Sequence, residues 1–222
     1  MDTSFTHLHC HSNFSLLDGV IPVEKLIEKA RNLGMKHIAL TDHNNLYAAV
    51  MFYEKAKENG IHPVIGSEIT LSDGSSVVLL VKDREGYKNL CEIITIGNIK
   101  GGHLKFEMDE TGIFKRHRGL IALSGGKKGR ITRFVQERNM DKAINECRKW
   151  KKVFGEDFYI EMQYYDGEDK LINYRLNDLS IALVVPVVCT NDVHFLTKSD
   201  FPLRRLMHAI KENTIISRVK SC

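Results

Sequence analysis

The sequence lacks the features that mark secreted, membrane-embedded or disulfide-stabilised proteins. Its five cysteines are odd in number and show no CxxC spacing, so they indicate neither a disulfide framework nor a zinc knuckle. No basic-then-apolar signal pattern opens the chain, and no apolar run approaches the ~18 residues that a bilayer span requires. We therefore expect a cytoplasmic protein that has no membrane partner.

A strong charge of either sign is also absent. The 222 residues carry 32 basic and 28 acidic side chains, and the formal net charge of +4 gives only a slight preference for anionic partners. A hydrophobic content of 43% allows a substantial core. The chain shows no internal repeat and no low-complexity stretch, so we expect residues 1–222 to form a single α/β domain.

The N-terminal segment 5–11 carries three histidines at alternate positions. Alternate side chains of a strand lie on the same face, so His7, His9 and His11 would share one side. Neutral imidazoles bind zinc, manganese or iron, and two of them two residues apart on a strand can hold one ion. The alternative interpretation is a set of buried histidines, each satisfied by a hydrogen bond.

The rest of the chain alternates between helical and extended patterns, which predicts an α/β barrel with a site at the C-terminal ends of its strands. Apolar residues at helical spacing predict helices that end at Gly34 and Gly60. A hairpin turn is expected at 72–75 and an irregular loop at 98–118. The predicted strands cover residues 5–11, 37–43, 63–68, 119–124, 157–163 and 184–190, and the later helices cover 84–97, 131–137, 140–154, 168–182 and 199–211.

Residues of metal-ligand type gather at or just beyond the predicted strand ends. Histidines and carboxylates drawn from several strands would fill more than one metal site, and Glu68 could bridge neighbouring ions. Two ions ~3.5–4 Å apart are the usual clamp for phosphoester hydrolysis, because they generate hydroxide at neutral pH and neutralise charge on the phosphoryl oxygens. The candidate ligands are His9, His11, Asp18, His43, Glu68, Asp192 and His194.

Ordered motifs with these spacings resemble the PHP (polymerase and histidinol phosphatase) domain. Two further elements, EGYKNL at 85–90 and GLIALSG at 119–125, make the sequence similar to the N-terminal PHP domains of the bacterial DNA polymerase III alpha-subunit family. The resemblance extends from about residue 5 to residue 211. The motifs that carry it are HLHCHS at 7–12, FSLLDG at 14–19, LTDH at 40–43, GSE at 66–68 and NDVH at 191–194.

The resemblance implies a distorted seven-stranded (β/α) barrel that holds a metal cluster and precedes a polymerase palm, so this chain would be a fragment. It also implies one ion on His9, His11, Glu68 and Asp192, which would be catalytic through metal-bound hydroxide, and a second ion on Asp18, His43 and His194. Two divalent ions of zinc, manganese or iron are therefore expected. Ser76 and Gly126 replace the His and Cys that complete a third site in the family, which places that site in doubt unless His103 supplies an imidazole.

The remaining polar residues have simpler interpretations. His7 is expected to orient a neighbouring ligand, and Asp42 to act as a structural hydrogen-bonding group. His208 is expected to be an ordinary helix histidine. The basic, glycine-rich loop 125–130 could meet a DNA phosphate through Lys127, Lys128 and Arg130, or could be a solvated loop.

Three functions are compatible with this sequence. The first is a metal-dependent phosphoesterase, a 3′–5′ exonuclease that proofreads DNA in a replicative polymerase. The second is a catalytically weakened domain that stabilises the polymerase or docks a proofreading or clamp subunit. The third is a free-standing phosphatase of the histidinol-phosphate type.

Overall fold

The computed structural model describes residues 5–102 and 105–219, which form two compact units. The first unit contains the residues up to Ile65 and those from Asp192 onward, and the second contains residues 66–191. Strand β2 (His62–Thr70) runs from the first unit into the second. No helix in the described ranges is long and apolar enough to cross a membrane.

In the first unit, β1 (His37–Leu40) pairs in parallel with residues 62–65 of β2. Helices α1 (Val23–Asn32) and α2 (Ala49–Glu58) cover these strands through buried side chains such as Ile27 and Phe52. Gly34 and Gly60 both take a left-handed φ of 71° just after these helices, as predicted. The unit ends with η3 (Lys198–Asp200), α8 (Phe201–Lys211) and η4 (Ile216–Arg218).

In the second unit, β2 continues into an antiparallel hairpin with β3 (Ser76–Val81), and β3 pairs antiparallel with β4 (Leu120–Leu123). Parallel pairing then adds β5 (Phe158–Met162) and β6 (Val187–Cys189). The predicted hairpin turn is confirmed, and Gly74 adopts its left-handed φ of 79°. The helical elements of this unit are α3 (Arg84–Gly101), α4 (Glu110–Phe114), η1 (Gly126–Lys128), α5 (Arg130–Gln136), α6 (Met140–Phe154), η2 (Gly155–Asp157) and α7 (Glu168–Leu183).

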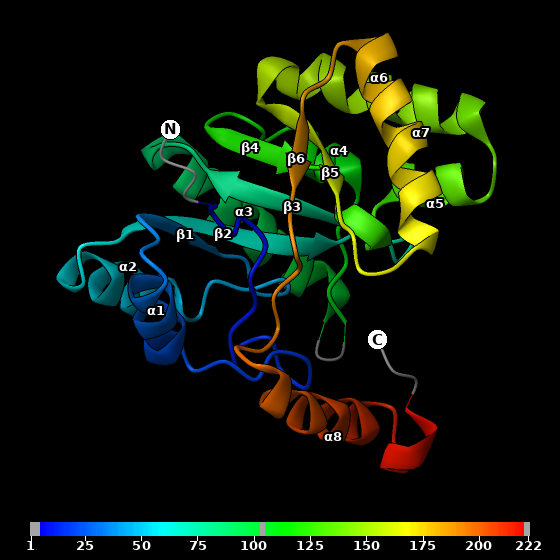
Figure 1. Cartoon of the computed structure of the whole chain (residues 1–222). Coiled ribbons are helices and arrows are strands. Elements are labelled where there is room, and N and C mark those ends of the chain that lie inside the picture. The colour runs from blue at the N-terminus through cyan, green and yellow to red at the C-terminus, as the bar shows by residue number, and fades with distance from the viewer. Residues whose placement is uncertain (1–4, 103–104, 220–222) are drawn as a thin grey trace. The chain divides into compact units, whose positions relative to one another are not determined.

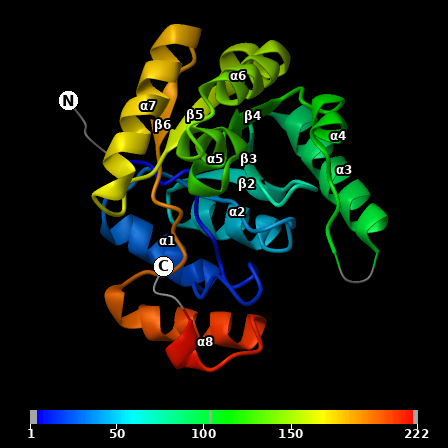
Figure 2. The same ribbon diagram turned by 90° about the vertical axis from the view of Figure 1, so that its right-hand side faces the viewer.

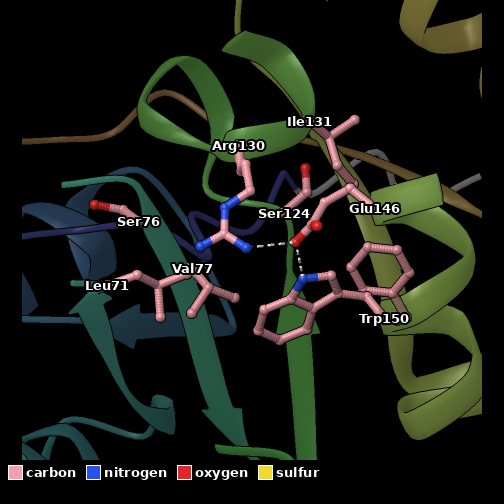
Figure 3. A pocket seen from close by; sticks show the side chains of 9 residues that line it. Leu71, Ser76, Val77, Ser124, Arg130, Ile131, Glu146 and Trp150 are labelled. Carbon is pink, nitrogen blue, oxygen red and sulfur yellow. Dashed lines mark hydrogen bonds and ion pairs between the residues drawn. The ribbon is translucent and has the colours of Figure 1, made fainter. Parts of the chain in front are cut away.

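Helices α5, α6 and α7 lie together in both views of the second unit (Figures 1 and 2). Arg130, the first residue of α5, forms ion pairs with Glu146 of α6 (3.1 Å), with Asp73 (3.0 Å) and with Glu110. The indole Nε1 of Trp150 donates to the same Glu146 carboxylate at 2.8 Å (Figure 3). This partly buried network supplies each carboxylate with N–H donors, as buried polar groups in a stable core require.

Two predictions about local structure are corrected. Residues 98–118 were predicted to be an irregular loop, but Asp109 caps a short helix by accepting a hydrogen bond from Gly112 N, and Ile113 of that helix is fully buried. The described residues contain six strands rather than the expected seven, because the histidine segment 7–11 forms only an isolated bridge, between Cys10 and Val193. The fold class is α/β, as predicted.

Candidate metal centre

The histidine segment lies between two other pieces of backbone in the first unit. On one side Ala39 N donates to His7 O at 2.9 Å and Thr41 N to Cys10 O at 2.8 Å. On the other side His11 N donates to Val193 O at 2.7 Å and Val193 N to His9 O at 2.9 Å. These bonds bring residues 9–11 and 192–194 together although 180 residues separate them in the chain.

A bulge interrupts the alternation of side chains in this segment. The donors Ala39 and Thr41 are two residues apart, but their acceptors His7 and Cys10 are three apart, and Cys10 N donates to the Thr41 hydroxyl instead of a carbonyl. His7 therefore lies on the side of Cys10, where both line an apolar cavity of about 90 Å³ beside α1. The expectation that His7 shares the face of His9 and His11 is wrong for this reason.

His9, His11 and Asp192 form the first cluster of candidate ligands. The Asp192 Oδ1 lies 3.0 Å from His11 Nε2 and 3.4 Å from His9 Nε2. Both imidazoles are buried, and their ligand atoms and that of Asp192 lie within 4.8 Å of one another. Asp192 takes a left-handed φ of 47° at this turn.

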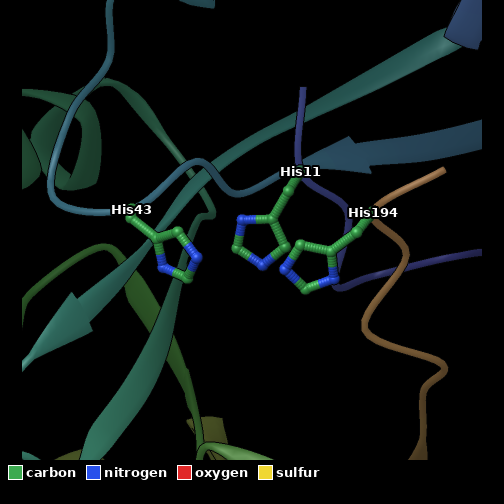
Figure 4. Close-up of side chains that lie close together, drawn as sticks. All are labelled: His11, His43 and His194. Carbon is green, nitrogen blue, oxygen red and sulfur yellow. The ribbon is translucent and has the colours of Figure 1, made fainter. Parts of the chain in front are cut away.

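Asp18, His43 and His194 form the second cluster. The Asp18 Oδ2 lies 2.9 Å from His43 Nε2 and 3.2 Å from His194 Nε2. The ring of His11 stacks between the other two imidazoles, with centroid distances of 4.2 Å to His43 and 4.3 Å to His194 (Figure 4). His11 therefore joins the two clusters.

The proton on the His11 ring is fixed by its neighbours. The Ser15 hydroxyl donates its single proton to Asp42 Oδ1 at 2.6 Å, so its oxygen accepts from His11 Nδ1 at 3.0 Å. With the proton on Nδ1, a neutral His11 ring presents the Nε2 lone pair to Asp192. The predicted structural role of Asp42 is confirmed, because this carboxylate also accepts from the Ser12 amide and hydroxyl, both at 2.7 Å.

His194 is arranged in the same way. Its Nδ1 donates to the backbone carbonyl of Asp192 at 2.8 Å, which directs Nε2 toward Asp18. Burial lowers the pKa of His194, and the hydrogen bond with Asp18 only partly opposes this effect.

The Asp18 carboxylate is ionised. Burial alone would raise its pKa, but hydrogen bonds with His194, His43 and His208 outweigh burial and hold the pKa of Asp18 well below its usual range. Ionised carboxylates and neutral imidazole nitrogens that converge in a buried place fit a divalent transition metal.

Two residues of this centre escaped the sequence prediction. Arg204 Nη2 lies 2.9 Å from Asp18 Oδ1, and His208 Nε2 lies 2.7 Å from the same oxygen. His208 was expected to be an ordinary helix histidine. Its spacing of four residues from Arg204 shows that both lie on one helix face, but no local pattern connects them with an aspartate about 190 residues earlier.

The remaining predicted site residues belong to the second unit. Glu68 lies on β2, is buried, and has Lys128 Nζ 3.6 Å from its carboxylate. Ser76 lines a small pocket together with Arg130. Gly126 has a left-handed φ of 52°, and a Cβ there would lie 2.3–2.5 Å from the Gln163 amide. His103 falls outside the described residues.

Comparison with known proteins identifies the class to which this fold and centre belong. The PHP domain family model matches residues 7–164. The fold is similar to a Bifidobacterium adolescentis protein assigned as a metal-dependent phosphoesterase, with a TM-score of 0.60 and 15% identity over 88% of this chain and 90% of that one. It is also similar to endonuclease Q in complex with a 27-mer duplex, with a TM-score of 0.51 and 11% identity over 86% and 49% of the two chains. The chain belongs to the PHP domain family.

Relatives by sequence are bacterial DNA polymerases. DNA polymerase III subunit alpha of Borreliella burgdorferi is 38% identical over 88% of this chain and 18% of its own length. The Aquifex aeolicus subunit is 31% identical over 100% and 21%, and the error-prone DNA polymerase of Symbiobacterium thermophilum is 35% identical over 97% and 21%. The chain thus spans about a fifth of the length of these relatives. The expected resemblance to DNA polymerase III alpha subunits is confirmed.

Proposed function

We propose that this chain is a metal-dependent phosphoesterase domain that removes nucleotides from the 3′ end of DNA within a replicative polymerase. One observation carries the proposal. The buried Nε2 atoms of His11 and His194 face the carboxylate oxygens of Asp192 and Asp18 over 3.0 and 3.2 Å. Imidazole nitrogens and carboxylate oxygens that converge at such separations in a buried place are the donor set that divalent transition metals prefer.

The donors divide between two ions. His9, His11, Asp192 and Glu68 would hold one, and Asp18, His43 and His194 the other. Glu68 is included because it is a buried carboxylate three residues beyond Ile65 on β2, and because the family resemblance assigns it this role. The mixed nitrogen and oxygen donors suit zinc, manganese or iron.

A third ion is not part of the proposal, for three reasons. Gly126 has no side chain, and the space beside it is filled by the Gln163 amide. Ser76 shares its pocket with the Arg130 guanidinium, which is a poor neighbour for a metal ion. Glu68, the remaining member of that ligand set, is already assigned to the first ion and has the Lys128 ammonium 3.6 Å from its carboxylate.

When bound, the ions would activate a water molecule for attack and neutralise charge on the phosphoryl oxygens. The chain supplies the geometry. Asp42 and Ser15 hold the proton of His11 on Nδ1, and the Asp192 carbonyl holds that of His194 on Nδ1, so both Nε2 atoms stay available as ligands. No serine, cysteine or threonine nucleophile is required.

Three observations support DNA as the substrate. The sequence relatives are DNA polymerases, one structural relative is endonuclease Q with duplex DNA, and the net charge of +4 is compatible with an anionic partner. Because the relatives are about five times longer, the palm and other domains of a longer polymerase chain would be its partners, together with a proofreading or clamp subunit. Residues 1–222 would then be a single N-terminal PHP domain of a cytoplasmic enzyme.

A nuclease assay tests this function. Purified protein is loaded with Mn²⁺ or Zn²⁺ and incubated with a 5′-labelled primer that carries a mismatched 3′ nucleotide on a template. Asp192→Asn removes one proposed ligand charge, while His62→Asn changes an exposed histidine at the start of β2 and serves as the control. We expect release of 3′ nucleotides by the wild type and by His62→Asn, and a rate at least ~10-fold lower for Asp192→Asn.

Other outcomes would favour the competing functions. A metal-loaded wild type that leaves DNA intact and hydrolyses no phosphate ester would favour the docking role. Hydrolysis of small phosphomonoesters without cleavage of DNA would favour the small-molecule phosphatase.

A further inference from the structure

The loop that carries Asp18 does not by itself hold the carboxylate. Leu17 has a left-handed φ of 59°, and the amides of Asp18 and Gly19 both donate to Ser15 O. These backbone bonds fix the turn but leave the side chain free to rotate about χ1 and χ2. The groups that contact the carboxylate come from residues 43, 194, 204 and 208.

The two oxygens of Asp18 have different partners. Oδ2 faces His43 and His194, which are proposed ion ligands. Oδ1 receives Arg204 Nη2 at 2.9 Å, Arg204 Nε at 3.3 Å and His208 Nε2 at 2.7 Å. A carboxylate oxygen with three donor contacts cannot also approach an ion closely, so only Oδ2 is available to a metal.

Helix α8 is built to deliver both donors to one point. Arg204 and His208 are four residues apart, so they lie on the same helix face one turn from each other. The start of the helix is fixed by the reciprocal bonds of Thr197 and Asp200. The segment that follows the helix is held to it by Arg205, whose Nη2 donates to Ile216 O at 2.8 Å. The Arg204 and His208 side chains are only 14% and 17% exposed, which restricts their movement.

We propose that Arg204 and His208 are positioning residues, which orient Asp18 so that its Oδ2 alone is presented to the ion held with His43 and His194. The inference rests on the proposed function, because it requires an ion at that place. Helix α8, which carries none of the proposed metal ligands, would then be part of the metal centre. Groups that hydrogen-bond to metal ligands affect metal affinity by ~10–100-fold, so the contribution is measurable.

Zinc binding to four variants tests this role. His208→Ala removes a donor, and His208→Gln can still donate to Asp18. Arg204→Lys keeps the positive charge but loses the contact of two nitrogens with one oxygen. Arg205→Lys makes the same chemical change on the adjacent residue, which bonds to the Ile216 and Val219 carbonyls instead of Asp18. Each variant is titrated with Zn²⁺ against a chromophoric chelator, and its thermal unfolding is recorded without metal.

We expect the wild type to bind two equivalents of zinc. His208→Ala and Arg204→Lys should weaken one equivalent about 10-fold or more and leave the other unchanged, His208→Gln should recover most of the lost affinity, and Arg205→Lys should match the wild type. Metal-free unfolding temperatures should not follow this order, since a purely structural role would move them together with affinity.

Two results would overturn the inference, and they are distinguishable. If the wild type binds two equivalents and both His208→Ala and Arg204→Lys bind them equally well, the positioning role is wrong while the metal centre stands. If the wild type binds no zinc, the proposed function fails and the inference fails with it.

Discussion

Asp192 in the first unit and Glu146 in the second are both carboxylates in largely buried surroundings, but their neighbours differ in kind. Glu146 is met by N–H groups only, from Arg130 at 3.1 Å, Trp150 at 2.8 Å and Lys149 at 2.6 Å. Asp192 Oδ1 is met by imidazole nitrogens, His11 Nε2 at 3.0 Å and His9 Nε2 at 3.4 Å. The first arrangement surrounds a carboxylate with permanent N–H donors, and the second brings together nitrogen and oxygen atoms that can bind a metal ion.

This difference separates structural from functional polar groups more clearly than burial does. A network in which every acceptor meets a donor contributes to the stability and specificity of the core. A cluster of imidazole nitrogens and carboxylate oxygens is instead stabilised when a cation binds to it. Substitutions in the two units should therefore affect different measurements.

The largest effect on stability is expected from Arg130→Met. Loss of this guanidinium leaves Glu146 on α6 with Lys149 as a charged partner, so the cost should lie at the lower end of the ~3–5 kcal/mol for removal of one partner from a buried ion pair. Chemical denaturation should show a loss of about 3 kcal/mol, while the zinc content of the folded protein stays constant. Arg133→Met, which removes an exposed partner of Asp73, is the matched control and should cost less than ~1 kcal/mol. Equal losses in both variants would contradict the distinction.

Asp192→Asn should lower zinc affinity and leave the stability of the metal-free protein nearly unchanged. The amide occupies the same volume but carries no charge, so we expect zinc affinity to fall by ~10–100-fold. Metal-free stability should change little, because the amide fills the same space as the carboxylate. The measurements are zinc titration and thermal unfolding of the metal-free protein. Metal affinity equal to that of the wild type would exclude Asp192 as a ligand.

A smaller effect is expected from acid, and it should arise in the network around Arg130. Burial alone would raise the pKa of Asp73, but hydrogen bonds from Arg130, Ser75 and Arg133 hold it well below the usual range. The folded state then binds fewer protons than the unfolded chain, so this contribution is present above about pH 4 and is lost as the pH falls further. Urea unfolding between pH 5 and pH 2.5 should show this slope in the wild type and a weaker slope in Arg130→Met. Identical slopes would mean that Arg130 does not depress the pKa of Asp73.

Much of the fold followed from local patterns. Gly34 and Gly60 end the first two helices, and the hairpin turn at 72–75 lies where its residues predicted it. These features depend on backbone conformations that only a few residue types favour, so they can be predicted from a short stretch of sequence.

The candidate centre was only partly predictable. His9, His11 and Asp192 were identified because parallel strand ends gather at one edge, and the structure brings them together. His7 was misassigned because a one-residue bulge reverses its face, and bulges depend on tertiary hydrogen bonds such as that from Cys10 N to the Thr41 hydroxyl. Arg204 and His208 reach Asp18 only through the path of α8, which no local pattern encodes.

The central claim is that the facing imidazoles and carboxylates form a centre for two ions. Elemental analysis of the folded protein at saturating zinc, combined with anomalous scattering from crystals, counts and locates the ions directly. We expect two fully occupied positions, one beside His9, His11 and Asp192 and one beside Asp18, His43 and His194. Three fully occupied positions, or zinc bound away from these histidines, would contradict the account.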